Sequence, residues 1–480
     1  MKKNRAPLVI ENILIENYAA EGKSLARLDG KVIFVENAVP GDVVDIRLGK
    51  NKKDWAEGHV IAYKKLAENR LDPFCKHFGV CGGCQWQMLP YANQLQYKQQ
   101  QITDQLSRIG KLSLPPIQPI VGATDTIAYR NKLEYTFADK RFIPFDEFRE
   151  LKAKGIEIPA SMPTGGFHAK GVFDKVVGID TCHLQAEPTN EIRNFVVEFC
   201  KTHHYPFYNI KTHEGWLRNM MVRLATTGEL MINLVVGFEN KKMKTQLLDA
   251  MLEKFPAITT LLYTVNTKFN DSMFGLVPQT YFGKGYIIEQ LSTKNKEHTY
   301  SFKISPKSFF QTNTKQAEQL YQITAAYAEL TGNETVYDLY CGTGSIGIFV
   351  SDKAKKIIGV EQVEEAIVDA KENAALNKIE HSFFTAGDVI DICNDDFFAT
   401  HGKPDVVITD PPRAGMHEKL VQKLLDIAAP LIVYVSCNPA TQARDLALLS
   451  EKYDVTALQP VDMFPHTHHI ENVAQLKLRN

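Results

Sequence analysis

The pattern of apolar and polar positions divides this chain into three parts. Over residues 1–65, short apolar runs alternate with glycines, a pattern typical of short strands joined by turns. The predicted strands cover residues 8–10, 13–15, 31–35, 42–46 and 58–63. Five short strands in so short a segment favour a small barrel of the OB type.

The rest of the chain mixes helices and strands. Residues 66–90 show no periodicity, residues 91–109 form a glutamine-rich helical pattern, and residues 115–310 mix both patterns as in an α+β domain. A helix is predicted over residues 314–330. From Glu334 onward, apolar strands alternate with glycine-rich turns and helices, which predicts a doubly wound α/β sheet.

The chain is therefore predicted to be a multidomain α/β protein of 480 residues. An OB-like β-barrel, a central α+β domain and a C-terminal Rossmann-like domain are expected over residues 1–65, 66–312 and 313–480. Hydrophobic residues make up 44% of the chain, as in globular proteins. No apolar run approaches the roughly 20 residues that cross a bilayer. The basic residues 1–7 precede no apolar signal core, so we expect a cytoplasmic protein.

Charge is distributed unevenly, although the net charge is only −1. Residues 1–110 contain 16 Lys and Arg against 12 Asp and Glu, whereas residues 331–480 contain 13 against 22. A contact with a polyanion would therefore lie at the front of the chain, although chance produces such asymmetry in many multidomain proteins. Basic residues concentrate near the predicted barrel tips: Lys23, Arg27, Lys50, Lys52, Lys53, Lys64 and Lys65.

A glycine-rich turn follows the first strand of the C-terminal domain. Gly342, Gly344 and Gly347 allow a tight turn and the close approach of a ligand to the backbone. The next strand ends at Glu361, 19 residues after Gly342, where a carboxylate can bind the hydroxyls of a ribose. This spacing also fits the dinucleotide fingerprint, so the turn alone leaves NAD and S-adenosylmethionine open.

Two later strands end in reactive side chains. Asp410 begins Asp-Pro-Pro-Arg after the strand at residues 405–409, and Cys437 lies in Ser-Cys-Asn-Pro after the strand at residues 431–435. The carboxyl ends of parallel strands meet at the ligand-binding edge of an open α/β sheet. A cysteine at a strand end is more often a packed apolar residue, and it is the neighbouring Asp410 that favours chemistry here.

A thiol at this edge suits methylation of uracil at C5. The addition of a thiolate to C6 makes C5 nucleophilic enough to attack a methyl donor, which is covalent catalysis. Because the thiolate is the reactive form, we expect the surroundings of Cys437 to lower its pKa. A base must then remove the C5 proton, and Glu471 is the candidate. The nearby His466, His468 and His469 admit a zinc site, which the absence of a partner motif disfavours.

These segments resemble the RNA uracil-5-methyltransferase family, which includes bacterial 23S ribosomal RNA enzymes and the tRNA thymine-loop enzyme. The matching stretches are Ser-Cys-Asn-Pro-Ala-Thr-x-Ala-Arg-Asp, Asp-Pro-Pro-Arg-Ala-Gly, His-Ile-Glu-Asn-Val and Ser-Pro-Lys-Ser-Phe-Phe-Gln-Thr-Asn, at residues 436–445, 410–415, 469–473 and 305–313. The resemblance implies Cys437 as nucleophile and Glu471 as proton acceptor. It places in the S-adenosylmethionine site Gln311, Tyr340, Glu361 and Asp410. Ser345 departs from the family, where several relatives carry Asn.

The aperiodic segment carries three cysteines at close spacing, and a distant fourth completes the set of Cys75, Cys81, Cys84 and Cys182. Four thiolates suit zinc or an iron–sulfur cluster, and spacing does not separate the two. The ribosomal RNA members of the family bind a [4Fe-4S] cluster at this pattern, so the resemblance implies a cluster. The other cysteines, Cys200, Cys341 and Cys393, are interpreted as structural.

Residues 1–65 resemble the TRAM domain, an RNA-binding barrel, through residues 22–30 and 39–42. The tRNA-type enzyme lacks both barrel and cluster, so the resemblance points to 23S ribosomal RNA as the partner of a monomeric enzyme. Methylation of tRNA, methylation of cytosine and a non-catalytic iron–sulfur RNA-binding protein stay open as alternatives.

Overall fold

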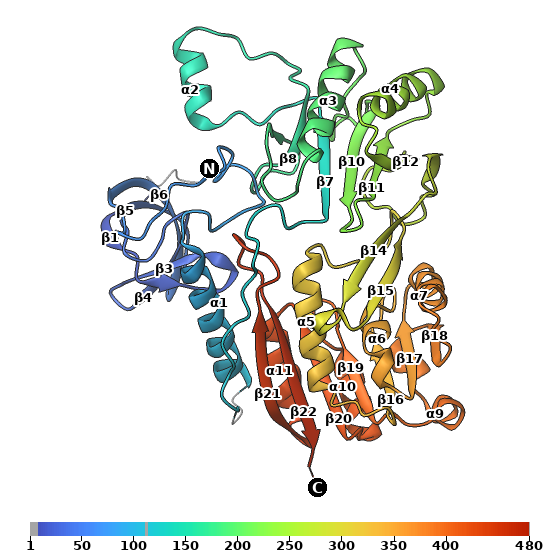
Figure 1. The fold of residues 1–480 in the computed structure, drawn as a ribbon. Coiled ribbons are helices and arrows are strands. Elements are labelled where there is room, and N and C mark those ends of the chain that lie inside the picture. Colours follow the sequence, from blue (N-terminus) through green and yellow to red (C-terminus); the bar gives the residue numbers. More distant parts are fainter. Residues whose placement is uncertain (1–7, 111–113, 480) are drawn as a thin grey trace.

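The computed structural model describes residues 8–110 and 114–479 (Figure 1). The basic residues at positions 1–7 lie outside this part of the chain. Within it, the strands form four sheets, and no helix is long and apolar enough to cross a membrane.

The amino-terminal sheet orders its six strands β1-β5-β6-β4-β3-β2. These strands are β1 (Val9–Leu14), β2 (Asn17–Tyr18), β3 (Ser24–Leu28), β4 (Lys31–Glu36), β5 (Val43–Asn51) and β6 (Trp55–Lys65). Side chains alternate across each strand, so Ile33 and Val44 are fully buried in the barrel core. The runs predicted at residues 8–10 and 13–15 form one strand, β1, with a shift of register between them. Strand β3 is not predicted because its inward residues, Ser24 and Ala26, are small.

The central domain is built on a seven-stranded sheet with the order β13-β12-β11-β10-β7-β8-β9. Its strands are β7 (Lys132–Ala138), β8 (Thr164–His168), β9 (Val176–Gly178), β10 (Leu217–Leu224), β11 (Leu230–Val236), β12 (Ile258–Val265) and β13 (Gln279–Phe282). Helices α3 (Thr189–Thr202) and α4 (Lys241–Lys254) pack on this sheet through a shared apolar core. Helix α2 (Phe145–Ala153) buries none of its residues and projects from the domain (Figure 1).

The C-terminal sheet has the order β18-β17-β16-β19-β20-β22-β21. Its strands are β16 (Thr335–Leu339), β17 (Lys356–Glu361), β18 (Ser382–Ala386), β19 (Val406–Thr409), β20 (Leu431–Ser436), β21 (Tyr453–Val461) and β22 (Glu471–Leu478). Strands β16 to β20 are parallel, and β22 runs antiparallel to both of its neighbours. The strand order reverses between β16 and β19, where open α/β sheets bind their ligands. This arrangement confirms the predicted doubly wound domain.

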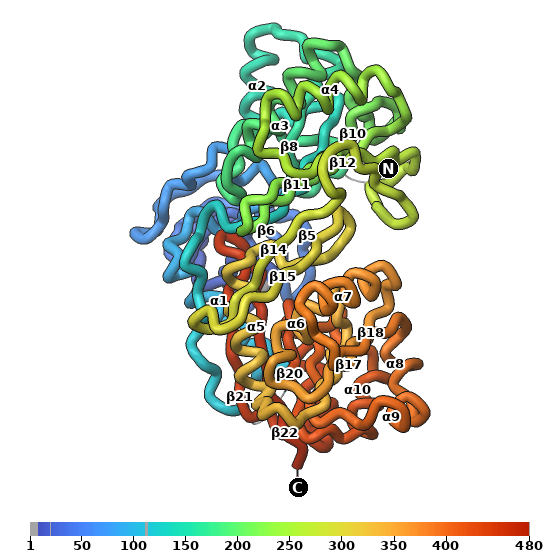
Figure 2. Tube along the Cα trace, turned by 45° about the vertical axis from the view of Figure 1, so that its right-hand side comes forward, coloured from blue at the N-terminus to red at the C-terminus, as the bar shows by residue number. Residues whose placement is uncertain are grey.

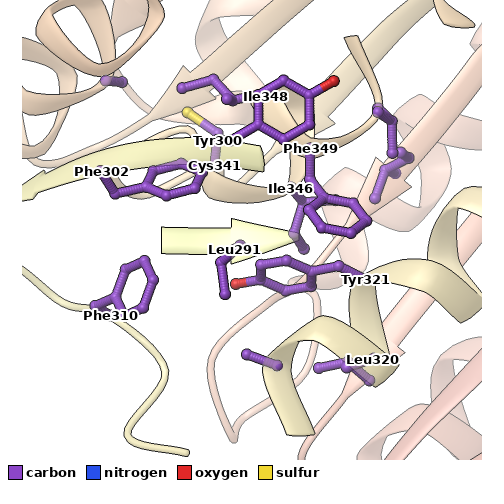
Figure 3. Close-up of a cluster of buried hydrophobic side chains, with 14 of the residues drawn as sticks. Leu291, Tyr300, Phe302, Phe310, Leu320, Tyr321, Cys341, Ile346, Ile348 and Phe349 are labelled. Carbon is purple, nitrogen blue, oxygen red and sulfur yellow. The ribbon is translucent and has the colours of Figure 1, made fainter. Parts of the chain in front are cut away.

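Helices cover this sheet, and two earlier segments pack on it as well. The helices are α5 (Thr314–Tyr327), α6 (Ser345–Phe349), α7 (Glu364–Leu376), α8 (Val389–Ile392), α9 (Asp395–His401), α10 (Glu418–Ile427) and α11 (Pro439–Leu449). The hairpin of β14 (Ile287–Ser292) and β15 (Thr299–Ile304) shares a core with α5 and α6 (Figure 3). The side chains of Asn373 and Asn377, on and just after α7, accept hydrogen bonds from the backbone of β15, at 2.7 and 2.8 Å.

Helix α1 (Tyr91–Gln105) is the other segment that joins the C-terminal domain. It continues into one turn of π-helix over Leu106–Gly110, and Ile102 and Leu106 enter the core beside α11. The predicted helix over residues 91–109 thus has a change of winding near its end. Figures 1 and 2 show α1 between the barrel and the C-terminal strands, where it can link the two.

Candidate active site

Three predicted site residues follow neighbouring strand ends of the C-terminal sheet. Tyr340 follows β16, Asp410 follows β19 and Cys437 follows β20. Parallel strands place these residues at one edge. Glu471 reaches the same edge from the other direction, because it is the first residue of the antiparallel strand β22. The next residue, Asn472, pairs with the last residue of β20.

The glycine-rich turn has the shape that the sequence predicts for a cofactor loop. Gly342 and Gly344 adopt φ angles of 53° and 76°, a region that favours glycine. A Cβ on Gly342 would meet nothing within 4 Å, so the backbone there is open to a ligand. The Glu361 carboxylate accepts hydrogen bonds from the backbone N–H groups of Gly342 (3.2 Å) and Val363 (2.9 Å). The turn and Glu361 are thereby fixed to each other.

Three further positions refine the picture of the donor site. Tyr340 adopts a φ of 62°, which a residue with a side chain rarely does, and such strain is common at ligand sites. Gln311 is buried just before α5, and its backbone carbonyl accepts a hydrogen bond from the Asn131 side chain (2.9 Å). Ser345, the departure from the family pattern, lies 2.9 Å from the Tyr321 hydroxyl, so its own hydroxyl has a partner inside the protein.

The site contains two carboxyl groups close together, of which Glu471 is buried and Asp410 is half-buried. Burial raises the pKa of both Asp410 and Glu471, and the charge of Asp410 raises the pKa of Glu471 further. Arg413 acts in the opposite direction on Glu471. A carboxylate with a raised pKa is a stronger base, which suits a residue that removes a proton from carbon.

Cys437 does not have the lowered pKa that the sequence led us to expect. Burial, followed by the charges of Glu471 and Asp410, raises the pKa of its thiol to about 11, whereas the charge of Arg413 lowers it. The prediction is therefore wrong for the ligand-free chain. The two carboxyl groups beside the thiol disfavour a third negative charge.

The segment before Glu471 is held by buried polar contacts with α1. Asp462 accepts hydrogen bonds from Lys98 (2.6 Å) and Tyr91 (2.7 Å), and Lys98 and Asp462 are both fully buried. The Gln94 side chain accepts a hydrogen bond from the backbone N–H of His466 (2.8 Å). Separation of such a buried ion pair would leave each charge buried without a partner, which costs free energy. The segment before Glu471 therefore has little freedom to move away from α1.

The three histidines of this segment have separate protein partners. Ring nitrogens of His466, His468 and His469 lie 3.1, 2.7 and 3.2 Å from the side chains of Gln94, Gln85 and Arg413. Burial lowers the pKa of the first two to about 4 and that of the third to about 3, so all three are neutral near pH 7.

The four predicted ligand cysteines line a single cavity of about 170 Å³, whose other walls include Phe78, Phe167, Ile179 and Leu184. Burial raises the pKa of Cys81 to about 11 and of Cys84 to about 12. Across residues 8–110 and 114–479, no three His, Cys, Asp or Glu side chains converge as ligands of one metal ion.

A groove of about 570 Å³ joins this cysteine loop to the reactive thiol. Its lining includes Cys437, Arg413 and His469 and, from the cysteine loop, Cys81 and Cys84. The barrel contributes Glu21, Lys23 and Glu36, and α1 contributes Gln101 and Gln105. All three parts of the chain thus meet beside Cys437.

Sequence reasoning missed several residues of this site. Arg413 stands in the recognised Asp-Pro-Pro-Arg segment, but only the structure shows that it faces Glu471, Cys437 and His469. The pair of Lys98 and Asp462 spans most of the chain, and no local pattern marks it. Three of the predicted basic tip residues, Lys23, Arg27 and Lys64, form ion pairs within the barrel, with Glu57, Glu16 and Asp45.

Known proteins similar to this chain match both ends of it. The sequence model of the tRNA (uracil-5-)-methyltransferase family matches residues 277–479, and that of the TRAM domain matches residues 10–61. An uncharacterized RNA methyltransferase of Bacteroides thetaiotaomicron is 50% identical over 96% of this chain and 100% of its own length. One of Chlorobaculum tepidum is 37% identical over 97% and 95% of the two chains.

A solved structure is similar over nearly the whole length. It is the Pyrococcus abyssi tRNA (uracil-54, C5)-methyltransferase in complex with S-adenosyl-L-homocysteine, with a TM-score of 0.72 and 28% identity. The similarity covers 97% of this chain and 100% of that one. Together with the matched segments and the geometry at Cys437, these similarities show that the chain belongs to the RNA uracil-5-methyltransferase family and carries an N-terminal TRAM domain.

Proposed function

We propose that this chain transfers the methyl group of S-adenosylmethionine to C5 of a uridine in 23S ribosomal RNA. One observation carries the proposal: Cys437, Asp410 and Glu471 meet at one edge of the sheet, beside a glycine-rich turn fixed to Glu361. Each residue type matches a requirement of the reaction. A thiol adds to C6, a carboxylate accepts the C5 proton, and the turn holds the donor.

The steps follow from this arrangement. Cys437 loses its proton to solvent in the groove, and its sulfur bonds to C6 of the uracil. The electron pair that moves to C5 then forms a bond to the methyl carbon of S-adenosylmethionine. The bond between this carbon and the donor's sulfur breaks, and S-adenosylhomocysteine is left. Glu471 then takes the C5 proton, the C5=C6 double bond re-forms and the C6–S bond breaks, which returns the Cys437 thiolate.

S-adenosylmethionine supplies the reactive methyl group and, when bound, a positive sulfonium charge. This charge favours the negatively charged forms of nearby acidic groups. In this proposal Gln311, Tyr340, Glu361 and Asp410 line its site. The positions of Tyr340, Glu361 and Asp410 at adjoining strand ends support the assignment.

The substrate base must leave its stack to reach Cys437, because the thiol is only partly exposed within the groove. Ribosomal RNA is our first candidate on the sequence resemblance alone, because the archaeal tRNA enzyme also aligns with 97% of this chain, so the barrel and the cysteine loop do not separate the two substrates. The structurally similar archaeal protein acts on tRNA by its name, which makes tRNA the second candidate.

Nucleoside mass spectrometry on RNA from a strain that lacks this gene tests the proposal. We expect 5-methyluridine to disappear from a 23S ribosomal RNA fragment and to return when the wild-type gene is restored. Loss of the nucleoside from tRNA alone would instead establish the second candidate. Loss of 5-methylcytidine without loss of 5-methyluridine would refute uracil methylation.

We further propose that Cys75, Cys81, Cys84 and Cys182 hold a [4Fe-4S] cluster. Four thiolates around one zinc ion lie only about 4 Å apart, because each Zn–S bond is about 2.3 Å. Here the thiols line a cavity of about 170 Å³, which fits a group larger than a single ion. When bound, the cluster would tie the loop at residues 75–84 to the central domain, and this role needs no change of oxidation state.

Removal of one proposed ligand gives a direct test. Cys182→Ala is expected to lose most of the iron and acid-labile sulfide of the purified protein, because three thiolates leave one iron without its protein ligand. Cys200→Ala is the matched control, since Cys200 is a buried thiol of the same domain that does not line the cavity. Zinc in place of iron in the wild type, or unchanged iron in Cys182→Ala, would contradict the cluster.

A further inference from the structure

Helix α1 carries a polar stripe that the proposed chemistry does not use in full. Gln94, Lys98, Gln101 and Gln105 are spaced three or four residues apart and so share one face of the helix. The first two are buried and hold the segment that leads to Glu471. The last two lie further along the same face, where they line the groove beside Cys437.

The charged groups of this groove nearly balance. Its cationic side chains are Lys23, Lys170 and Arg413, and its carboxylates are Glu21 and Glu36. Lys170 forms an ion pair with Glu36 (3.1 Å), and Lys23 forms one with Glu57 (3.1 Å). A surface that binds RNA mainly through phosphates presents unpaired Lys and Arg, so this groove is poorly suited to phosphate binding alone.

Side-chain amides are the other polar groups in the groove: Asn37, Gln85, Gln101, Gln105 and Asn438. Gln85 and Asn438 already have protein partners, namely His468 and the backbone of Arg413 and Ala440. Gln105 differs, because its buried Oε1 has no hydrogen-bond partner within the described residues. A buried carbonyl oxygen without a partner is costly, so a donor that arrives with a ligand would relieve that cost.

We propose that Gln101 and Gln105 hydrogen-bond the base edges of nucleotides adjacent to the methylated uridine, which makes α1 a sequence-reading element. This inference rests on the proposed function. A glutamine amide offers a donor and an acceptor side by side, the pattern that pairs with the edge of a base. Sequence-specific proteins read RNA in unpaired segments, where base edges are exposed, and a base flipped toward Cys437 leaves its neighbours in this state.

The position of Gln101 and Gln105 on α1 has a physical consequence. The same helix face fixes the Glu471 segment and reads the neighbouring bases. Neighbours that fit would therefore place the target base in a fixed position relative to Cys437. The chain would then select its uridine by the adjacent bases, and the barrel would contribute binding strength.

The test uses the full chain and short single-stranded RNAs with one central 5-fluorouridine and randomised neighbours. In the presence of S-adenosylmethionine, fluorine at C5 cannot be removed as a proton would be, so accepted RNAs stay covalently attached and can be sequenced. The wild type is expected to enrich particular neighbours by roughly 10- to 100-fold, the discrimination that a good base contact provides. Gln101→Ala/Gln105→Ala is expected to trap RNA without that enrichment.

Gln100→Ala is the matched control, because Gln100 is an exposed residue of the same helix that does not line the groove, and it should keep the wild-type preference. The inference is overturned if the double variant keeps the wild-type enrichment, or if the wild type traps RNA with no preference at these positions. If the wild type traps no RNA at all, uracil methylation itself is refuted and the reading role falls with it. A purely structural role would lower the amount of trapped RNA and leave the enrichment unchanged.

Discussion

Cys437→Ala is expected to form no covalent complex with RNA that contains 5-fluorouracil, and to lower methylation by at least about 1,000-fold. Without the sulfur, nothing adds to C6, and C5 of uracil remains too weak a nucleophile to take the methyl group. Denaturing gel electrophoresis of radiolabelled RNA measures the complex, and tritium transfer from S-adenosylmethionine measures the methylation. A trapped complex with Cys437→Ala equal to that of the wild type would show that another group is the nucleophile.

Cys393→Ala is a suitable control, because Cys393 is a buried thiol of the same domain outside the groove. The pH dependence of the wild type provides a second check. Since the pKa of Cys437 is raised to about 11 in the ligand-free chain, its thiolate fraction increases with pH throughout the neutral range. The rate of complex formation should therefore rise from pH 6 to pH 9, and a rate that falls over this range would contradict a thiolate nucleophile.

Glu471→Gln is expected to accumulate the covalent complex on ordinary RNA. The amide keeps the shape of the side chain but cannot take the C5 proton, so Cys437 can add and the methyl group can transfer while release is blocked. General-base catalysis contributes about 100- to 10,000-fold, and turnover should fall by a factor in this range. The fraction of enzyme bound covalently to unmodified RNA, measured after a single turnover, reports the effect.

Glu329→Gln tests whether replacement of a different glutamate by glutamine also makes the covalent complex accumulate. Glu329 is an exposed carboxylate that pairs with Lys477 of β22, away from the groove. Its variant should turn over normally and accumulate no complex. If Glu471→Gln also shows no accumulation, Asp410 becomes the candidate for the proton acceptor, because it is the other carboxyl group beside Cys437.

Features encoded within a single stretch of chain could be predicted from the sequence. The turn at Gly342 and Gly344, the carboxylate at Glu361 and the loops at Asp410 and Cys437 each follow an apolar strand. One rule, that parallel strands end at the same edge, places them together without knowledge of packing. The barrel could be predicted where inward residues are large, as at Ile33, and not in β3, where they are small.

Long-range packing decided the rest. The pKa of Cys437 depends on how deeply it is buried and on charges that arrive from β19 and β22, so a local pattern predicted the wrong direction. Likewise, helix α1 reaches the catalytic segment through pairs such as Lys98 and Asp462, whose members are far apart in sequence.

The sequence by itself determined which residues can do chemistry here and that most of them lie at one edge of an α/β sheet. Periodicity and strand-end position are local properties, and they are enough for that conclusion. Only the tertiary structure decided the electrostatics of Cys437, the contact between α1 and the Glu471 segment, and the groove shared by barrel, cysteine loop and reactive thiol. Burial and charge proximity depend on segments that meet only after folding, and no periodicity in the sequence records which segments those are.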